Sequence, residues 1–292
     1  MKGMIMKTVD ITYRYETRDT PARPRPLDSS AALGRLNDGN RGFAALLEDP
    51  TNKHVQRIIS VDSRDLGLGD ANLPKQRPFA AILGCSDARV PVELIFNEGP
   101  NDLFVIRVAG NGLGTEILGS LKYAVDNLSG SLKLIVVLGH SGCGALTTAV
   151  DVFLNPTDYL PLVTMHSLRR ILDSLLVVVR ASARKFQSAF GPEISHHPRY
   201  REALIEASIV NNAALAAYSI QQELGTSDPA ELQTVYGVYL LESRHVWAPR
   251  VNEMKGIGLA MAPRDPSGFM ELGNAILQSD RITSLLGPKQ RG

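Results

Sequence analysis

Apolar residues in the middle of the chain form short runs that are separated by longer amphipathic stretches. The runs 79–84, 103–108 and 132–139 are strongly apolar and are followed at once by turn residues, and 233–241 alternates loosely between apolar and polar positions. Short apolar runs bounded by turn residues are typical of buried strands. The pattern therefore predicts four strands.

Amphipathic stretches with apolar residues three and four positions apart lie between and around these runs, and such spacing indicates helices. The predicted helices cover 29–47, 115–128, 144–154, 167–186, 201–224 and 270–277, with a short helical turn over 90–96. Gly39-Asn40 interrupts the first of them as a weak point or bend. Alternating strands and helices are typical of parallel sheets with right-handed crossovers. We therefore expect an α/β fold with a mostly parallel central sheet of about four to five strands, flanked by helices.

The rest of the chain suggests a domain flanked by two extensions. Residues 1–28 end in a proline-rich stretch and predict an extended N-terminal arm, which is either a disordered tail or an arm that embraces a second subunit. Residues 51–73 are polar and predict irregular structure. Residues 29–248 form the expected catalytic α/β domain. Residues 249–292, rich in Gly and Pro, predict a C-terminal tail that packs on the domain or on a partner subunit.

Charge and apolar content exclude several classes of protein. The formal net charge is +1, which gives no electrostatic argument for binding nucleic acid or an anionic membrane. Every apolar run is much shorter than the roughly 20 residues of a membrane-spanning helix, and residues 1–28 lack the apolar core of a signal peptide. We therefore expect a cytoplasmic protein.

The only two cysteines of the chain follow two of the predicted strands closely. Cys85 comes directly after the run 79–84, His140 follows 132–139, and Cys143 lies three residues further on. If both runs are parallel strands of one sheet, these side chains meet at its carboxyl edge, where open α/β sheets bind ligands. Two thiolates and one imidazole with an open fourth position form a catalytic zinc site. A lone cysteine at a strand end is more often a small buried apolar residue, so the pairing of the two segments carries the metal hypothesis.

Asp87 and Arg89 lie two residues apart in the turn after the first strand, and three interpretations stay open. The two side chains can form an ordinary salt bridge. Arg89 can instead form a bidentate ion pair with Asp87, so that the fixed carboxylate orients a water molecule on the metal. In the third interpretation, Asp87 is itself the fourth metal ligand and closes the site.

Three segments together resemble the β-class carbonic anhydrases. They are 85–90 (Cys-Ser-Asp-Ala-Arg-Val), 102–111 (Asp-Leu-Phe-Val-Ile-Arg-Val-Ala-Gly-Asn) and 138–144 (Leu-Gly-His-Ser-Gly-Cys-Gly). The likeness extends to 36–43 and to Gln76-Arg-Pro78. It covers roughly residues 33–247 and is densest from 76 to 146. Ala88, Val108 and Arg244 depart from the residues usual in that family.

The resemblance implies a lyase that reversibly hydrates carbon dioxide to bicarbonate and a proton, by attack of a zinc-bound hydroxide. It implies three zinc ligands, namely Cys85, His140 and Cys143. It makes Asp87 and Arg89 the catalytic dyad that orients the hydroxide. Gln76 becomes a hydrogen-bonding residue for substrate across a subunit interface, in a homodimer or homotetramer.

Rival functions remain for the same residues. One is hydrolysis of a carbon dioxide analogue, carbonyl sulfide or carbon disulfide, at the same zinc site. Another is a non-catalytic relative that binds zinc or bicarbonate, although an intact Asp87-Arg89 pair argues against it. A metal-free thiol enzyme that uses Cys85 and His140 is a third.

Overall fold

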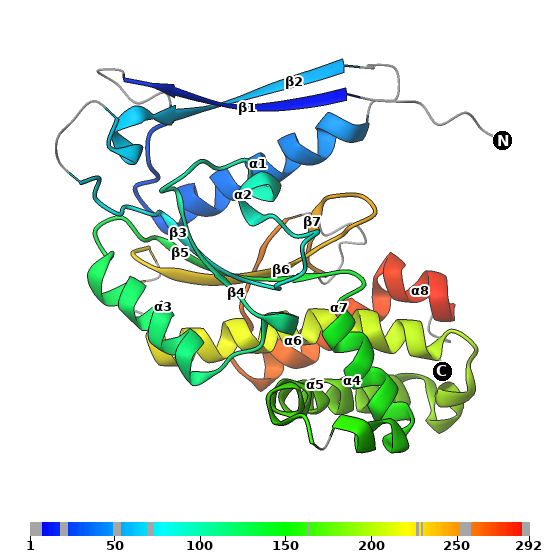
Figure 1. The fold of residues 1–292 in the computed structure, drawn as a ribbon. Coiled ribbons are helices and arrows are strands. Elements are labelled where there is room, and N and C mark those ends of the chain that lie inside the picture. The colour runs from blue at the N-terminus through cyan, green and yellow to red at the C-terminus, as the bar shows by residue number, and fades with distance from the viewer. Residues whose placement is uncertain are drawn as a thin grey trace.

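A computed structural model gives the structure of residues 8–17, 23–48, 54–68, 73–162, 164–225, 228, 230–250 and 258–287. Within these ranges a central sheet lies between two helical layers, and a separate pair of strands covers the outer side of one layer (Figure 1). The predicted α/β fold with a mostly parallel sheet is confirmed.

The central sheet has the strand order β4-β3-β5-β6-β7, and β8 also pairs with β6. The strands are β3 (Ala80–Gly84), β4 (Leu103–Arg107), β5 (Leu134–His140), β6 (Gln233–Tyr239), β7 (Val246–Trp247) and β8 (Ala260–Met261). The first four are parallel, whereas β7 and β8 run antiparallel to β6. Every residue of β3 and β5 is buried, as expected for strands covered on both faces.

Helices cover both faces of the sheet. On one side lie α1 (Ser29–Glu48) and α2 (Val92–Phe96), and on the other are α3 (Thr115–Asn127), α4 (Gly144–Leu154), α5 (His166–Phe190) and α6 (Tyr200–Leu224). The short 3₁₀ segments are η1 (Ser63–Leu66), η2 (Ala109–Asn111), η3 (Pro156–Leu162) and η4 (Pro192–His196). Two buried apolar clusters fill the spaces on either side of the sheet.

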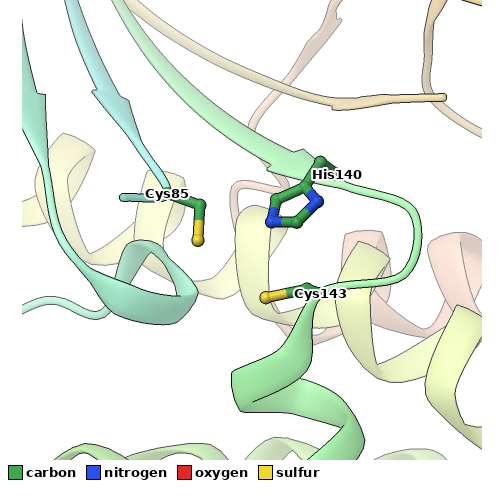
Figure 2. Close-up of side chains that lie close together, drawn as sticks. All are labelled: Cys85, His140 and Cys143. Carbon is green, nitrogen blue, oxygen red and sulfur yellow. The ribbon is translucent and has the colours of Figure 1, made fainter. Parts of the chain in front are cut away.

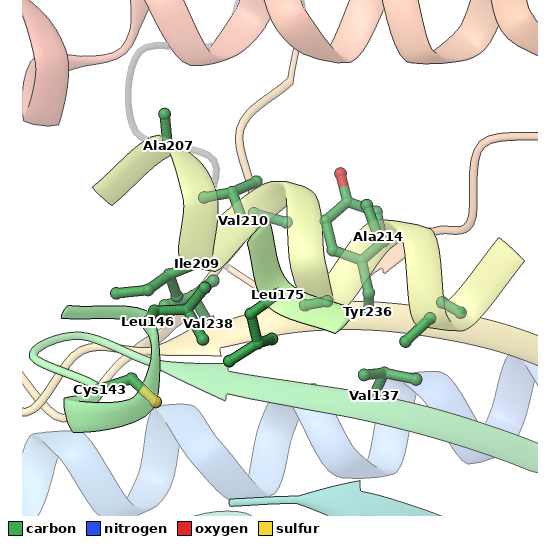
Figure 3. Close-up of a cluster of buried hydrophobic side chains, with 14 of the residues drawn as sticks. Val137, Cys143, Leu146, Leu175, Ala207, Ile209, Val210, Ala214, Tyr236 and Val238 are labelled. Atoms are coloured by element: carbon green, nitrogen blue, oxygen red, sulfur yellow. The ribbon is translucent and has the colours of Figure 1, made fainter. Parts of the chain in front are cut away.

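Helix α6 packs directly on the sheet. Figure 3 shows its apolar side chains in one buried cluster with those of β5 and β6, including Val137, Ile209, Val210, Ala214, Tyr236 and Val238. By length and composition alone α6 is apolar enough to cross a membrane, but 72% of its most apolar stretch is buried inside the protein. Its apolar character is therefore accounted for by the core.

A two-stranded parallel ribbon lies over α1 (Figure 1). It pairs β1 (Thr8–Glu16), which falls within the predicted arm, with β2 (His54–Asp62). The prediction of irregular structure for 51–73 is therefore wrong for β2 and for η1. The outer positions of β1 and of the first half of β2 are exposed, most inner positions are partly covered, and Ile59 and Val61 are buried. Apolar residues therefore lie mainly on one side of each strand, which is a weaker sequence pattern than the continuous apolar run of a fully buried strand.

Helix α1 runs through Gly39-Asn40 without a break, so the predicted weak point is wrong. Gly39 lies against the Phe96 carbonyl of α2, where a side chain has no room. Asn40 is buried and donates from Nδ2 to the carbonyls of Ile95 and Arg244, at 3.3 and 3.0 Å. The pair is thus a packing contact between α1, α2 and the turn before β7.

The C-terminal segment folds back onto the domain as α7 (Pro266–Gln278) and α8 (Asp280–Leu286). The predicted helix over 270–277 is confirmed and begins earlier, because Asp265 caps it by accepting from the Gly268 N–H and Pro266 occupies its first turn. The second helix, α8, was not predicted.

Candidate metal centre

The first two predicted ligands meet because their strands are neighbours. Strands β3 and β5 pair in parallel with Gly84 opposite Leu138, so Cys85 and His140 emerge at the same carboxyl edge. Gly142 has a left-handed backbone with φ of 65°, which turns the chain back so that Cys143 occupies the N-cap position of α4. The two sulfur atoms and the imidazole point into one common space (Figure 2).

The three side chains have the arrangement of a metal centre. All are buried, and their donor atoms lie within 4.8 Å of one another. Two sulfur ligands each about 2.3 Å from a tetrahedral zinc ion would be about 3.8 Å apart, so the spread is of the right size. The predicted convergence of Cys85, His140 and Cys143 is therefore present in the fold.

The imidazole of His140 is oriented for ligation. Its Nδ1 lies 3.0 Å from the Ser141 carbonyl oxygen and donates a hydrogen bond to it. The other nitrogen, Nε2, then carries the lone pair. Among the described residues this atom has no hydrogen-bond partner although it is buried. A buried acceptor without a donor is costly, and a cation among the two sulfur atoms would satisfy it.

The two thiols affect one another strongly. A hydrogen bond from Cys143 is the main cause that lowers the pKa of Cys85 to about 3. The same contact, together with burial, raises the pKa of Cys143 far above its usual range. One thiolate therefore forms readily and opposes the second. A divalent cation removes this opposition because it stabilises both thiolates at once.

Asp87 lies beside the three donors and is held by Arg89. Arg89 donates from Nε to Oδ1 at 2.9 Å and from Nη2 to Oδ2 at 2.6 Å, and its backbone N–H also donates to Oδ1. These hydrogen bonds, the side-chain ones first, hold the pKa of Asp87 well below its usual range. Oδ2 is 3.9 Å from Nε2 of His140. An ionised, fixed carboxylate thus faces this imidazole nitrogen.

A family model described as carbonic anhydrase matches residues 80–240, more than half of the chain. The chain belongs to the β-carbonic anhydrase family. It is 42% identical over 120 residues to carbonic anhydrase 2 of Mycobacterium tuberculosis and 39% identical over 121 residues to the carbonic anhydrase of Mycolicibacterium smegmatis. Each match covers 41% of this chain and 52% of the relative, so the chain spans about half the length of these curated relatives.

Among solved structures, the β-carbonic anhydrase CcaA is similar, with 24% identity and a TM-score of 0.45 over 66% of this chain and 80% of that one. The family match includes β3, β5 and all three predicted donors, Cys85, His140 and Cys143.

The segment around Cys85 is held by an arginine that the sequence analysis did not single out. Arg107 ends β4 and lies opposite Gly84 in the parallel pair. It donates from Nε to the Cys85 carbonyl at 3.0 Å and from Nη2 to the Asp87 carbonyl at 2.5 Å. Its place in the family-like segment 102–111 was the only available signal.

Gln76 is exposed and lies ahead of β3, whereas Cys85 follows that strand. The five residues of β3 separate the two positions by about 17 Å, at about 3.3 Å per residue. Within one chain the fold therefore does not bring Gln76 to the metal centre, and its predicted role requires a second subunit.

The three departures from the family pattern lie outside the donor set. Ala88 is exposed beside the dyad, and Val108 is a half-buried residue after β4. Arg244 has φ of 65°, the left-handed conformation that favours glycine. A glycine at this position would adopt this conformation without strain.

Proposed function

We propose that the protein is a carbonic anhydrase that holds a zinc ion through Cys85, His140 and Cys143 and reversibly hydrates carbon dioxide to bicarbonate and a proton. The observation that carries this proposal is the convergence of three buried donors beside a carboxylate that Arg89 already fixes. Family membership supports the reaction.

The donor set suits zinc. Two thiolates and one neutral imidazole favour a borderline-soft, tetrahedral ion, and three protein ligands leave one position open, as in catalytic sites. When bound, zinc would lower the pKa of a water ligand and make hydroxide available near neutral pH. Because both cysteines must stay reduced to serve as ligands, we expect a reducing compartment such as the cytoplasm.

Asp87 and Arg89 would orient the attacking oxygen. Asp87 is ionised and accepts a hydrogen bond from the nucleophile, which aims the remaining oxygen lone pair at the carbon of the substrate. Arg89 prevents the carboxylate from rotating, because two charge-assisted hydrogen bonds in a fork geometry fix its plane. The engagement of Asp87 by Arg89 favours this role over that of a fourth metal ligand.

A first experiment measures zinc content and stopped-flow hydration of carbon dioxide at about pH 7.5 and about pH 8.5. We expect turnover at both values in the wild type. Cys143→Ser should lose zinc and activity together. Asp87→Asn should keep zinc and lose activity by about 100-fold or more.

Other outcomes would change the proposal. Full activity of Asp87→Asn would contradict the role of the dyad, and activity only at the higher pH would indicate that Asp87 closes the metal site. Zinc-loaded protein that is inactive at both values would overturn carbonic anhydrase activity. The same sample would then be assayed with carbonyl sulfide and carbon disulfide, which separates an analogue hydrolase from a non-catalytic zinc-binding relative.

We further propose a homodimer, or a homotetramer built from such dimers, in which Gln76 of one subunit completes the site of another. The separation of Gln76 from Cys85 within one chain supports this arrangement. Co-expression of Gln76→Ala with Cys143→Ser tests it. Each variant alone should be inactive. About half of the co-expressed dimers should be mixed, and one of the two sites in each mixed dimer should be intact. About a quarter of all sites should therefore be active. No recovery in isolated mixed dimers would contradict the shared site.

A further inference from the structure

The segment from His140 to Cys143 carries two of the three proposed ligands. It is anchored through the side chain of Ser141. Ser141 is buried, and its Oγ accepts the Leu241 N–H at 2.9 Å and donates to Oε2 of Glu242 at 2.9 Å. Its backbone N–H donates to the Tyr239 carbonyl at the end of β6. Ser141 is thus fixed from both sides by the turn that follows β6.

An arginine of the C-terminal helix α8 holds the turn after β6 in place. Arg281 donates from Nη1 to Oε1 of Glu242 at 2.5 Å. Its Nε and Nη2 lie 2.7 and 2.6 Å from Oε2 of Glu206, a residue of α6. The guanidinium also lies 5.9 Å from the ring centroid of Trp247. One largely buried cation therefore joins α8, α6 and the turn after β6.

The chain of contacts ends on the metal-ligand histidine. The Ser141 carbonyl accepts the hydrogen bond from Nδ1 of His140 and so determines which ring nitrogen carries the lone pair. If Ser141 rotates, that carbonyl moves and the imidazole loses the partner that sets its tautomer and its plane. Three side chains, Arg281, Glu242 and Ser141, thereby connect a C-terminal helix to the orientation of one ligand.

We propose that Arg281, Glu242 and Ser141 form a positioning chain that keeps Nε2 of His140 directed at the metal. The proposal rests on the proposed zinc site and adds a function for the C-terminal segment. Glu242 and Arg281 both lie beyond residues 80–240, which match the family model. None of the three has a donor in the cluster of Cys85, His140 and Cys143, so they act through His140 as positioning residues.

The competing explanation is that Arg281 only fastens α8 to α6. Such a fastening would contribute to stability without affecting the metal. Arg201 provides a matched control, because it donates to both carboxylate oxygens of Asp151 at 2.6 and 2.9 Å and joins α6 to α4. Arg201→Met removes an equally short ion pair between helices, but none of the hydrogen bonds of Arg201 described here leads to Ser141.

The experiment measures zinc release to an excess of chelator and the absorption spectrum of the cobalt(II)-substituted protein. Arg281→Met and Ser141→Ala should release zinc about 10- to 100-fold faster than the wild type and should change the cobalt bands. Arg281→Lys should restore part of the effect, and Arg201→Met should match the wild type. The double variant of Arg281 and Ser141 should release zinc no faster than Ser141→Ala alone, because both changes interrupt one chain.

The outcomes are distinct. If Arg281→Met lowers the melting temperature but keeps wild-type zinc release and cobalt bands, the positioning chain is refuted and the fastening explanation holds. If Arg281→Met does not fold, Glu242→Ala replaces it, because that side chain is 55% exposed and its loss should be tolerated. Failure of the wild type to bind zinc at all would instead refute the proposed function.

Discussion

Two glycines of α1 allow the packing of that helix to be tested with the same substitution in two environments. Gly34 is exposed, and a Cβ added there would meet nothing within 4 Å. Gly39 is buried, and a Cβ added there would overlap the Phe96 carbonyl oxygen and lie 2.8 Å from its carbonyl carbon. Because both positions lie in the same helix, the change in helix propensity and in the unfolded chain is nearly the same for Gly34→Ala and Gly39→Ala.

The two substitutions should change the free energy of unfolding in opposite directions. Gly34→Ala should stabilise the protein by about 0.5–1 kcal/mol, because alanine favours a helix over glycine by that amount. At Gly39 the same gain is opposed by overpacking, which costs about 1–3 kcal/mol. The neighbouring Asn40 would also shift away from the Ile95 and Arg244 carbonyls and lose about 1 kcal/mol for one weakened hydrogen bond. Gly39→Ala should therefore lose about 1–3 kcal/mol.

Urea unfolding followed by the fluorescence of Trp247 measures this difference, since Trp247 is the only tryptophan of the chain and is buried. Protein concentration must be kept constant, because oligomerisation would add to the apparent stability. We expect the free energies of unfolding of the two variants to differ by about 1.5–4 kcal/mol. If Gly39→Ala is as stable as Gly34→Ala, the close approach of α1 to α2 is not present in the protein.

Three further predictions concern other parts of the molecule. Arg244→Gly should be about 1 kcal/mol more stable than Arg244→Ala in urea unfolding, because φ at this position is 65°; equal stability would contradict the strain. Burial, opposed by hydrogen bonds from Arg35, raises the pKa of Glu98 to about 7. The folded state then binds more protons between about pH 4.5 and pH 7, so the free energy of unfolding should fall as pH rises there, by at most about 1.4 kcal/mol per pH unit. Glu98→Gln should remove this slope, and an unchanged pH profile would refute it. Removal of metal by a chelator should lower the melting temperature of the wild type and leave that of Cys143→Ser unchanged, since a ligand at 100 times its Kd adds about 2.7 kcal/mol.

The buried strands could be predicted because their sequences are almost entirely apolar. Strands β3 and β5 are buried along their whole length, and their sequences are continuous apolar runs. Strand β1 alternates regularly between apolar and polar residues, but the prolines that follow it directed the prediction towards an extended arm. Helix α8 is only seven residues long, which is too short for helical periodicity to stand out.

The donors of the candidate metal centre could be predicted for a different reason from the residues that hold them. Each donor lies at the end of a strand or shortly after it, so topology alone brings Cys85 and His140 together. Ser141 and Glu242 are separated by 101 positions, and Glu242 and Arg281 by 39. Contacts at such separations depend on how α8 packs, and no local pattern in the sequence encodes that.

These supporting contacts explain how the fold keeps the two thiols and the imidazole close together. Two thiols of which only Cys85 ionises readily, and an imidazole with an unsatisfied nitrogen, would not stay together in a flexible loop. Arg107 holds the first ligand segment by its carbonyls, and Arg281 holds the second through Glu242 and Ser141. Both cations come from outside the two segments that carry the donors, so the folded scaffold orders the donors without a metal ion. A site prepared in this way should bind its ion without a large rearrangement of the backbone.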